Sequence, residues 1–176
     1  MNENKNEILK HSATYGAIIG FALIIYSVLL YILGLSLSKV LGYFSFLIII
    51  GGLYIGIKNF RDNEPSGAIT YGRAVGAGVL ICVFLGFLGS VFTYLQFRFI
   101  DPGLVDKIFE MTEEKLYDRG LSEDMIEMQI RAMSKMMTPG IMAVFGFISY
   151  LFWGTVFSLI LAAILKKEPH SLERPQ

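Results

Sequence analysis

The sequence predicts an all-α integral membrane protein with four transmembrane helices and an amphipathic helical hairpin between the third and the fourth. Hydrophobic residues make up 54% of the 176 residues, and the mean hydropathy of +0.57 is too high for a soluble domain that must cover itself with polar groups. These residues are gathered in four blocks that contain no Asp, Glu, Lys, Arg or His. The charged residues lie between the blocks, which is typical of a multi-pass membrane protein.

The four apolar blocks are long enough to cross a membrane, because a helix rises about 1.5 Å per residue and the hydrocarbon layer is roughly 30 Å thick. The first block is longer than the apolar core of a secretory signal, about 7 to 15 residues, and no small-residue cleavage site follows it, so we expect it to remain as a helix. The short connection at 34–39 predicts that the first two spans form an antiparallel hairpin. The predicted transmembrane domain covers residues 15–165, with spans at 15–37, 40–57, 74–97 and 140–165.

The charges in the loops predict the orientation of the chain. An even number of spans places both termini on the same side of the membrane, and positively charged loops mark the cytoplasmic side. The loop between the second and third spans carries Lys58, Arg61 and Arg73, whereas the loop between the first two carries only Lys39. We therefore expect residues 1–14 to be a cytoplasmic N-terminal segment and residues 166–176 a cytoplasmic, disordered tail.

Small residues predict how the spans pack. Lipid tails are as apolar as leucine, so helices in a membrane associate by close approach across small side chains. Such residues recur at every fourth position of the third span, which we therefore expect to be the central helix of the bundle. The same seam is also compatible with a homodimer contact or with a ligand between helices. The seam consists of Ala74, Gly78, Cys82, Gly86 and Ser90.

The segment between the third and fourth spans, residues 101–138, predicts a helical hairpin on the extracytoplasmic side. Between Ser122 and Met137, charged residues share one arc of a helical projection and apolar residues fill the rest. Ser122 is a good N-cap, and Glu127 and Arg131 have the spacing of an ion pair. Gly120 predicts the end of the first hairpin helix.

The apolar face of the second hairpin helix is rich in methionine and is the candidate partner face. It must be covered by the ends of the bundle, by lipid headgroups or by another protein, and methionine suits irregular partners. Thioethers also suit Cu(I), but no His or Cys accompanies these methionines, so we predict no metal site. The candidate residues are Met125, Met128, Met133 and Met136.

The composition argues against several other functions. A net charge of zero does not provide the basic surface that nucleic-acid binding needs. The spans hold no ionisable acid or base, neither His11 nor His170 has a convincing partner nearby in the sequence, and no catalytic motif appears. We therefore expect no enzymatic activity, no cofactor and no ion-coupled transport, which usually requires charges within the membrane.

The runs YIGIKNFRDNEPSGAITYGRAVGAG, from Tyr54, and FRFIDPGLVDKI, from Phe97, resemble a family of small four-span bacterial membrane proteins known as domain of unknown function 4199. The resemblance covers roughly residues 10–165. It implies an inner-membrane location, as in the Bacteroidota from which the family is best known, and a helical bundle. It brings no established activity, cofactor or catalytic residue.

The resemblance directs attention to the basic turn. Lys58, Arg61 and Arg73 lie near the membrane interface, where each could attract an anionic lipid headgroup by about 1 kcal/mol. Asp62 and Glu64 are placed to pair with them. The alternative is that the three cations only anchor the topology.

Together these features favour a non-enzymatic scaffold or accessory subunit, whose hairpin and basic turn engage other membrane components. The expected partners are membrane lipids and another membrane protein or a second copy of the chain. The alternative function is a small channel or carrier for a neutral or lipid-like solute.

Overall fold

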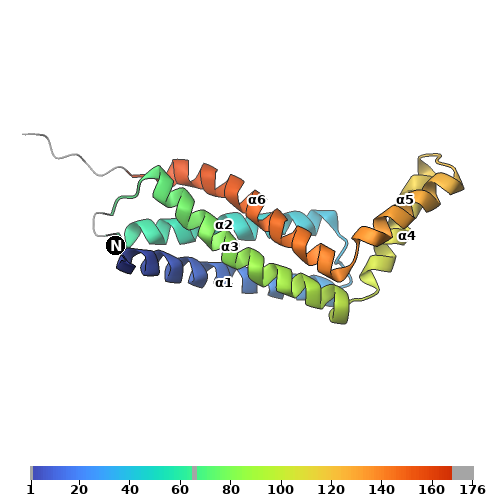
Figure 1. Ribbon diagram of the computed structural model, residues 1–176, viewed down its shortest axis with the longest axis horizontal. Helices are drawn as coiled ribbons and strands as arrows, with labels where there is room; N and C mark the ends of the chain where they lie inside the picture. Colours follow the sequence, from blue (N-terminus) through green and yellow to red (C-terminus); the bar gives the residue numbers. More distant parts are fainter. Residues whose placement is uncertain (1, 65–66, 168–176) are drawn as a thin grey trace, which may run out of the picture. The chain divides into compact units, whose positions relative to one another are not determined.

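The fold is entirely helical in the part of the chain that the structure, a computed structural model, describes: residues 2–64 and 67–167, with side chains from residue 6 onward (Figure 1). Within those ranges no strand is present, and the only β-type pairing is an isolated bridge between Ile69 and Lys167. The predicted all-α fold is therefore confirmed. The elements are α1 (Asn2–Ile32), α2 (Lys39–Asp62), α3 (Tyr71–Leu95), the π-helix η1 (Gln96–Ile100), α4 (Leu104–Asp118), α5 (Glu123–Met136) and α6 (Pro139–Leu165).

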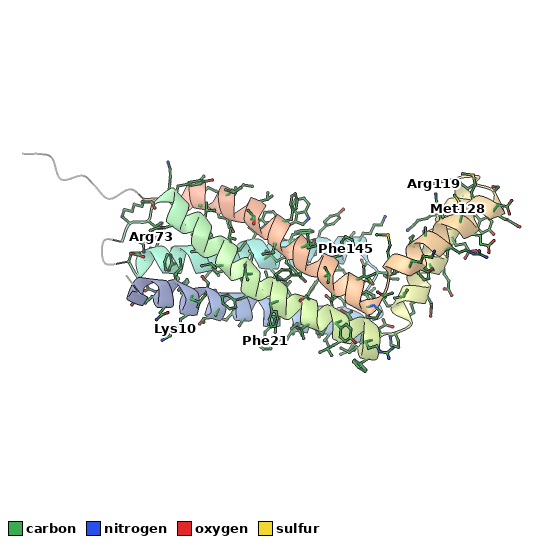
Figure 2. The ribbon with its side chains drawn as sticks, in the orientation of Figure 1. Lys10, Phe21, Arg73, Arg119, Met128 and Phe145 are labelled. Carbon is green, nitrogen blue, oxygen red and sulfur yellow. The ribbon has the colours of Figure 1, made fainter. Side chains whose placement is uncertain are left out.

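Four helices are long and apolar enough to span a membrane, which makes the chain a multi-pass membrane protein. The spanning segments are Asn6–Ile32, Lys39–Asp62, Tyr71–Ile100 and Pro139–Leu165. Large apolar side chains point away from the packed interior, as Figure 2 shows for Phe21 on α1, which is 55% exposed. Phe152 on α6 is 61% exposed. Such side chains are costly in water and favourable against lipid tails.

The helix ends differ from the predicted spans. α1 begins at Asn2, so the described part of the predicted N-terminal segment is helical, and it ends at Ile32. A Schellman motif sets that end: Leu35 N donates to Leu30 O at 2.8 Å, and Gly34, with a φ of 69°, donates to Tyr31 O. Hydropathy finds the membrane-embedded part of a helix, whereas capping decides where the helix stops.

Of the predicted disordered tail, residues 166–176, residues 168–176 lie outside the described residues. Its first residues, Lys166 and Lys167, are described. Lys167 exchanges two backbone hydrogen bonds with Ile69, at 2.9 and 3.1 Å, which tie the end of α6 to the loop before α3.

The chain divides into two compact units, Met1–Leu88 with Ile148–Gln176, and Gly89–Phe147. The first unit contains α1, α2, the first part of α3 and the last part of α6, which lie side by side (Figure 1). Its core is formed by buried aliphatic side chains from all four of these helices. They include Ile19 of α1, Leu53 and Ile57 of α2, Ile81 and Leu85 of α3, and Ala162 of α6.

Glycine and serine bring the helices of the first unit into close contact. A methyl group added at Gly16 of α1 would lie 2.7 Å from the carbonyl oxygen of Ile81 in α3. One added at Gly56 of α2 would lie 2.8 Å from Ile81 Cδ1, and Gly154 of α6 lies directly against Cys82 of α3. α3 therefore contacts α1, α2 and α6.

The second unit holds the hairpin, in which α4 and α5 pack on each other (Figure 1). Leu104 and Leu116 of α4 and Ile126 of α5 are buried, with exposed fractions of 2 to 7%. Gly120 has a φ of 74°, and Leu121 N donates to Leu116 O at 3.3 Å, which confirms the predicted stop. The turn between the two helices therefore has defined geometry.

The predicted caps of the later helices are found in part. Ser122 occupies the N-cap of α5, but its side chain makes no cap hydrogen bond with the described residues. The ion pair between Glu127 and Arg131 is present at 2.6 Å. Thr138 Oγ1 accepts a hydrogen bond from Ile141 N at 3.4 Å and thereby caps the start of α6.

Replacing Gly16 with alanine is expected to lower the stability of the bundle. The new methyl group would meet Phe84 Cβ at 2.6 Å and the backbone of α3, which cannot move aside cheaply, so the loss should be about 1–3 kcal/mol. The matched control is Gly76→Ala in α3, where no described atom lies within 4 Å. Thermal denaturation in detergent compares the two variants. Equal melting temperatures for both would contradict the packing described here.

Gly120→Ala is expected to loosen the hairpin, because a residue with a side chain costs about 1–2 kcal/mol in the left-handed conformation. Gly103→Ala is the control, since Gly103 has an ordinary φ of −78°. Hydrogen exchange of the full-length protein should show faster exchange in α4 and α5 for the first variant only. Unchanged protection in Gly120→Ala would show that the turn does not hold the pair together.

Candidate functional site

A cavity of about 480 Å³ opens in the first unit where the start of α1, the end of α2 and the start of α3 meet. We call it the N-terminal cavity. Its wall combines both signs of charge with aromatic rings, which is an unusual mixture for a chain whose spans are almost free of charge. The lining residues are Glu7, Lys10, His11, Phe60, Asn63, Glu64 and Arg73.

His11 is fixed in the wall of this cavity by α2. Its Nε2 lies 2.9 Å from the carbonyl oxygen of Gly56, and because a carbonyl can only accept, Nε2 carries the hydrogen. The ring also packs against Tyr15 at 4.6 Å and Phe60 at 5.1 Å between centroids. The hydrogen-bond partner of His11 comes from a helix about forty-five residues away, which is why no convincing partner appears nearby in the sequence.

Arg73 and Glu64 form the second fixed feature. The two Nη atoms of Arg73 donate to the two carboxylate oxygens of Glu64 at 2.7 and 3.2 Å, which is the bidentate geometry that holds both groups in place. The Glu64 side chain is 17% exposed and that of Arg73 is 49% exposed. The guanidinium also lies over the Phe60 ring, with Cζ 6.0 Å from the centroid.

The three cations of the predicted basic turn do not form a single cluster. Arg61 pairs with Asp62 at 2.7 Å and donates to Leu165 O at 3.4 Å. Lys58 is exposed and forms no ion pair with the described side chains. The expected pairing of Arg61 and Arg73 with Asp62 and Glu64 is confirmed, and of the three cations Arg73 alone lines the N-terminal cavity.

The seam of α3 is occupied by α6. Gly78 lies against Ser158 and Cys82 against Gly154, so the structure fills these two positions with side chains of the same chain. Ala74 and Gly86 are also buried, whereas Ser90 is half-buried. Small residues of α3 and α6 thus meet directly at both positions.

The methionine face of α5 is divided in two. Met125, Met128 and Met136 are 49%, 65% and 57% exposed, and we call these three residues the exposed methionine face. Met133 is half-buried and shares a side of α5 with Ile126, which is buried in the hairpin. Met133 therefore belongs to the packed side, and the candidate partner face is narrower than the sequence suggested.

A shallow depression of about 420 Å³ runs beside the exposed methionine face. Two carboxylates and two cations border it, next to Met128 and Ala132. Figure 2 shows Met128 near the turn of the hairpin. The α5 surface therefore combines an apolar strip with a row of charged side chains along one edge, the acidic residues first and the basic residues after them in the sequence. The bordering charges are Asp124, Glu127, Arg131 and Lys135.

Sequence reasoning missed most of the N-terminal cavity because its residues come from three helices. The available signal was the concentration of charged and aromatic residues at the polar ends of the first three spans. Nothing in the sequence pairs Glu7 or His11 with Phe60 or Arg73. His170, the other histidine, lies outside the described residues.

Of three comparisons with known proteins, the comparison with protein families gives a match. The family described as "Protein of unknown function (DUF4199)" matches residues 14–167, which is most of the chain. No curated protein and no solved structure matches the sequence. The chain therefore belongs to the DUF4199 family of proteins of unknown function.

Proposed function

We propose that the protein is a non-enzymatic scaffold or accessory subunit of the bacterial inner membrane, which binds a helix of another membrane protein through the exposed methionine face of its hairpin. The observation that carries the proposal is the division of α5 into two sides. Ile126 is 2% exposed on one side, whereas Met128 is 65% exposed on the other. The hairpin therefore has its own core and still presents a separate apolar strip.

Methionine supports this role because its unbranched side chain and polarisable sulfur adapt to the shape of a partner. Burying each exposed methionine would stabilise a complex by up to about 1.5–3 kcal/mol before the cost of ordering its side chain. The strip is too narrow to form a large core by itself. It suits the apolar side of a single amphipathic helix.

The charges beside the strip favour a protein partner over an anionic lipid surface. Asp124 and Glu127 precede Arg131 and Lys135 along α5, so the border of the depression is acidic at one end and basic at the other. Anionic headgroups would be attracted to one end and repelled from the other. A helix with the opposite order of charges would match both ends, which gives specificity and register.

The alternative, a channel or carrier for a neutral or lipid-like solute, has less support. Such a role needs a polar route between spans. The close contacts of Gly78 with Ser158 and of Cys82 with Gly154 leave little space between α3 and α6 at those levels. The scaffold is therefore the function we favour.

Photocrosslinking in native membranes tests the partner. A photoreactive residue at position 128 or 136 is expected to capture the same membrane protein, because both positions lie on the exposed methionine face. Position 134 is the matched control, since Ser134 is also exposed but lies on the opposite side of α5. Adducts identified by mass spectrometry should be absent there. Capture of the same proteins from position 134, or no capture from 128 and 136, would contradict the proposal.

A polar methionine face should abolish association without unfolding the protein. The combined change Met125→Gln, Met128→Gln and Met136→Gln is expected to release the captured partner while the melting temperature in detergent stays unchanged, because all three side chains are exposed. Met111→Gln on α4, where the side chain is 39% exposed, is the control and should retain the partner. If the triple variant kept the partner, the hairpin would bind through another surface.

The proposed orientation places both termini in the cytoplasm and the hairpin outside. Cys82 is fully buried, so cysteines introduced elsewhere can be labelled selectively. We expect a membrane-impermeant maleimide to label Glu114→Cys in intact spheroplasts, and to label Lys58→Cys only after permeabilisation. The reverse pattern would show that the orientation is inverted. Labelling of both cysteines before permeabilisation would show that Lys58 and Glu114 lie on the same side, which contradicts the proposed topology.

A further inference from the structure

The N-terminal cavity has balanced charges, which limits what it can bind. Lys10 and Arg73 contribute positive charge, and Glu7 and Glu64 contribute an equal negative charge. A polyanion such as a nucleotide would meet as much repulsion as attraction. A ligand that carries both signs of charge within one small group would find a counter-charge for each.

Several polar groups in the cavity remain available to a ligand. The Arg73–Glu64 pair uses one hydrogen on each Nη of the arginine, so the other N–H groups of Arg73 are not engaged by Glu64. Glu7 and Lys10 form no ion pair with any side chain in the described part of the protein. Asn63 donates through Nδ2 to Asn59, which leaves its Oδ1 as an acceptor.

The position of the cavity indicates the source of such a ligand. Glu7 and Lys10 lie at the polar start of the spanning segment Asn6–Ile32, before its charge-free part, and Asn63 caps the end of α2. These ends lie at the level of lipid headgroups when the helices cross a membrane. Figure 2 shows Lys10 extending outward from α1, and its flexible stem allows the ammonium group to turn over a group that enters the cavity.

We propose that the N-terminal cavity binds a phosphate and a primary ammonium group carried by one molecule, as in the headgroup of phosphatidylethanolamine. The phosphate would accept hydrogen bonds from Arg73 and Lys10. The ammonium group would donate to Glu7 and to Asn63 Oδ1, while Phe60 and His11 form the floor. Phosphatidylcholine cannot make the second set of contacts because its quaternary ammonium has no N–H, and phosphatidylglycerol has no cation.

Native mass spectrometry of the full-length protein in detergent tests this assignment with the three lipids at equal chain length. Phosphatidylethanolamine is expected to bind at least about tenfold more tightly than the other two, the difference expected from one charge-assisted hydrogen bond. Glu7→Gln and Lys10→Gln should each remove about tenfold of that affinity. Both side chains are exposed, so neither change should prevent folding.

Two control variants separate a specific site from general attraction. Lys58→Gln removes a cation from α2 that does not line the cavity, and Glu110→Gln removes a carboxylate from the hairpin; neither should change binding. The inference is overturned if phosphatidylglycerol binds as tightly as phosphatidylethanolamine. It is equally overturned if Lys58→Gln weakens binding as much as Lys10→Gln.

Competition with glycerophosphoethanolamine, the water-soluble form of the headgroup, identifies the source of the ligand. If it displaces the lipid at similar concentration, the cavity recognises a soluble phosphate–amine. If it fails to compete, the acyl chains contribute and the ligand is a membrane lipid. Because the cavity and the exposed methionine face share no residue, the result is independent of the partner experiments above.

Discussion

The close approach of α3 to its neighbours is the constraint on which the bundle depends. Apolar side chains gain little by moving from lipid tails into a helix interface, so the association of helices in a membrane relies on van der Waals contact and on hydrogen bonds. Gly16 permits the backbone of α1 to approach that of α3, and Gly154 permits α6 to approach it at Cys82. If α3 were held further away, its buried side chains Ile81 and Leu85 would lose van der Waals contact with the neighbouring helices.

This mode of packing forces the polar chemistry to the ends of the spans. A seam of small residues has no space for large polar side chains, and a charge within the hydrocarbon layer costs several kcal/mol or more. The charged side chains therefore gather where the helices leave the membrane. One group forms the N-terminal cavity, with the Arg73–Glu64 pair at its edge, and another covers the two-helix hairpin.

The sequence predicted the features that depend on neighbouring residues along one helix. The four spans, the Glu127–Arg131 pair and the stop at Gly120 all follow from local periodicity and capping. Two features could not be predicted. The contact of His11 with Gly56 depends on how α1 is rotated against α2, and the separation of Met133 from Met128 depends on where α4 packs. A helical projection gives the angles between residues but not the position of the neighbouring helix.

The loop before α3 links the cavity to the rest of the bundle. Glu64 belongs to this loop, whose later residues Ala68 and Ile69 are buried, and Ile69 is tied by backbone hydrogen bonds to Lys167 beyond the end of α6. The loop that carries the Glu64 carboxylate is thus attached, at its other end, to the residues that follow α6. Because the cavity exists only when the first three helices are assembled, a ligand bound there would stabilise the assembled state, and this stabilisation would rise with the logarithm of ligand concentration above the dissociation constant. Headgroup recognition and helix packing would then reinforce each other, and a lipid of the right class would act as part of the fold.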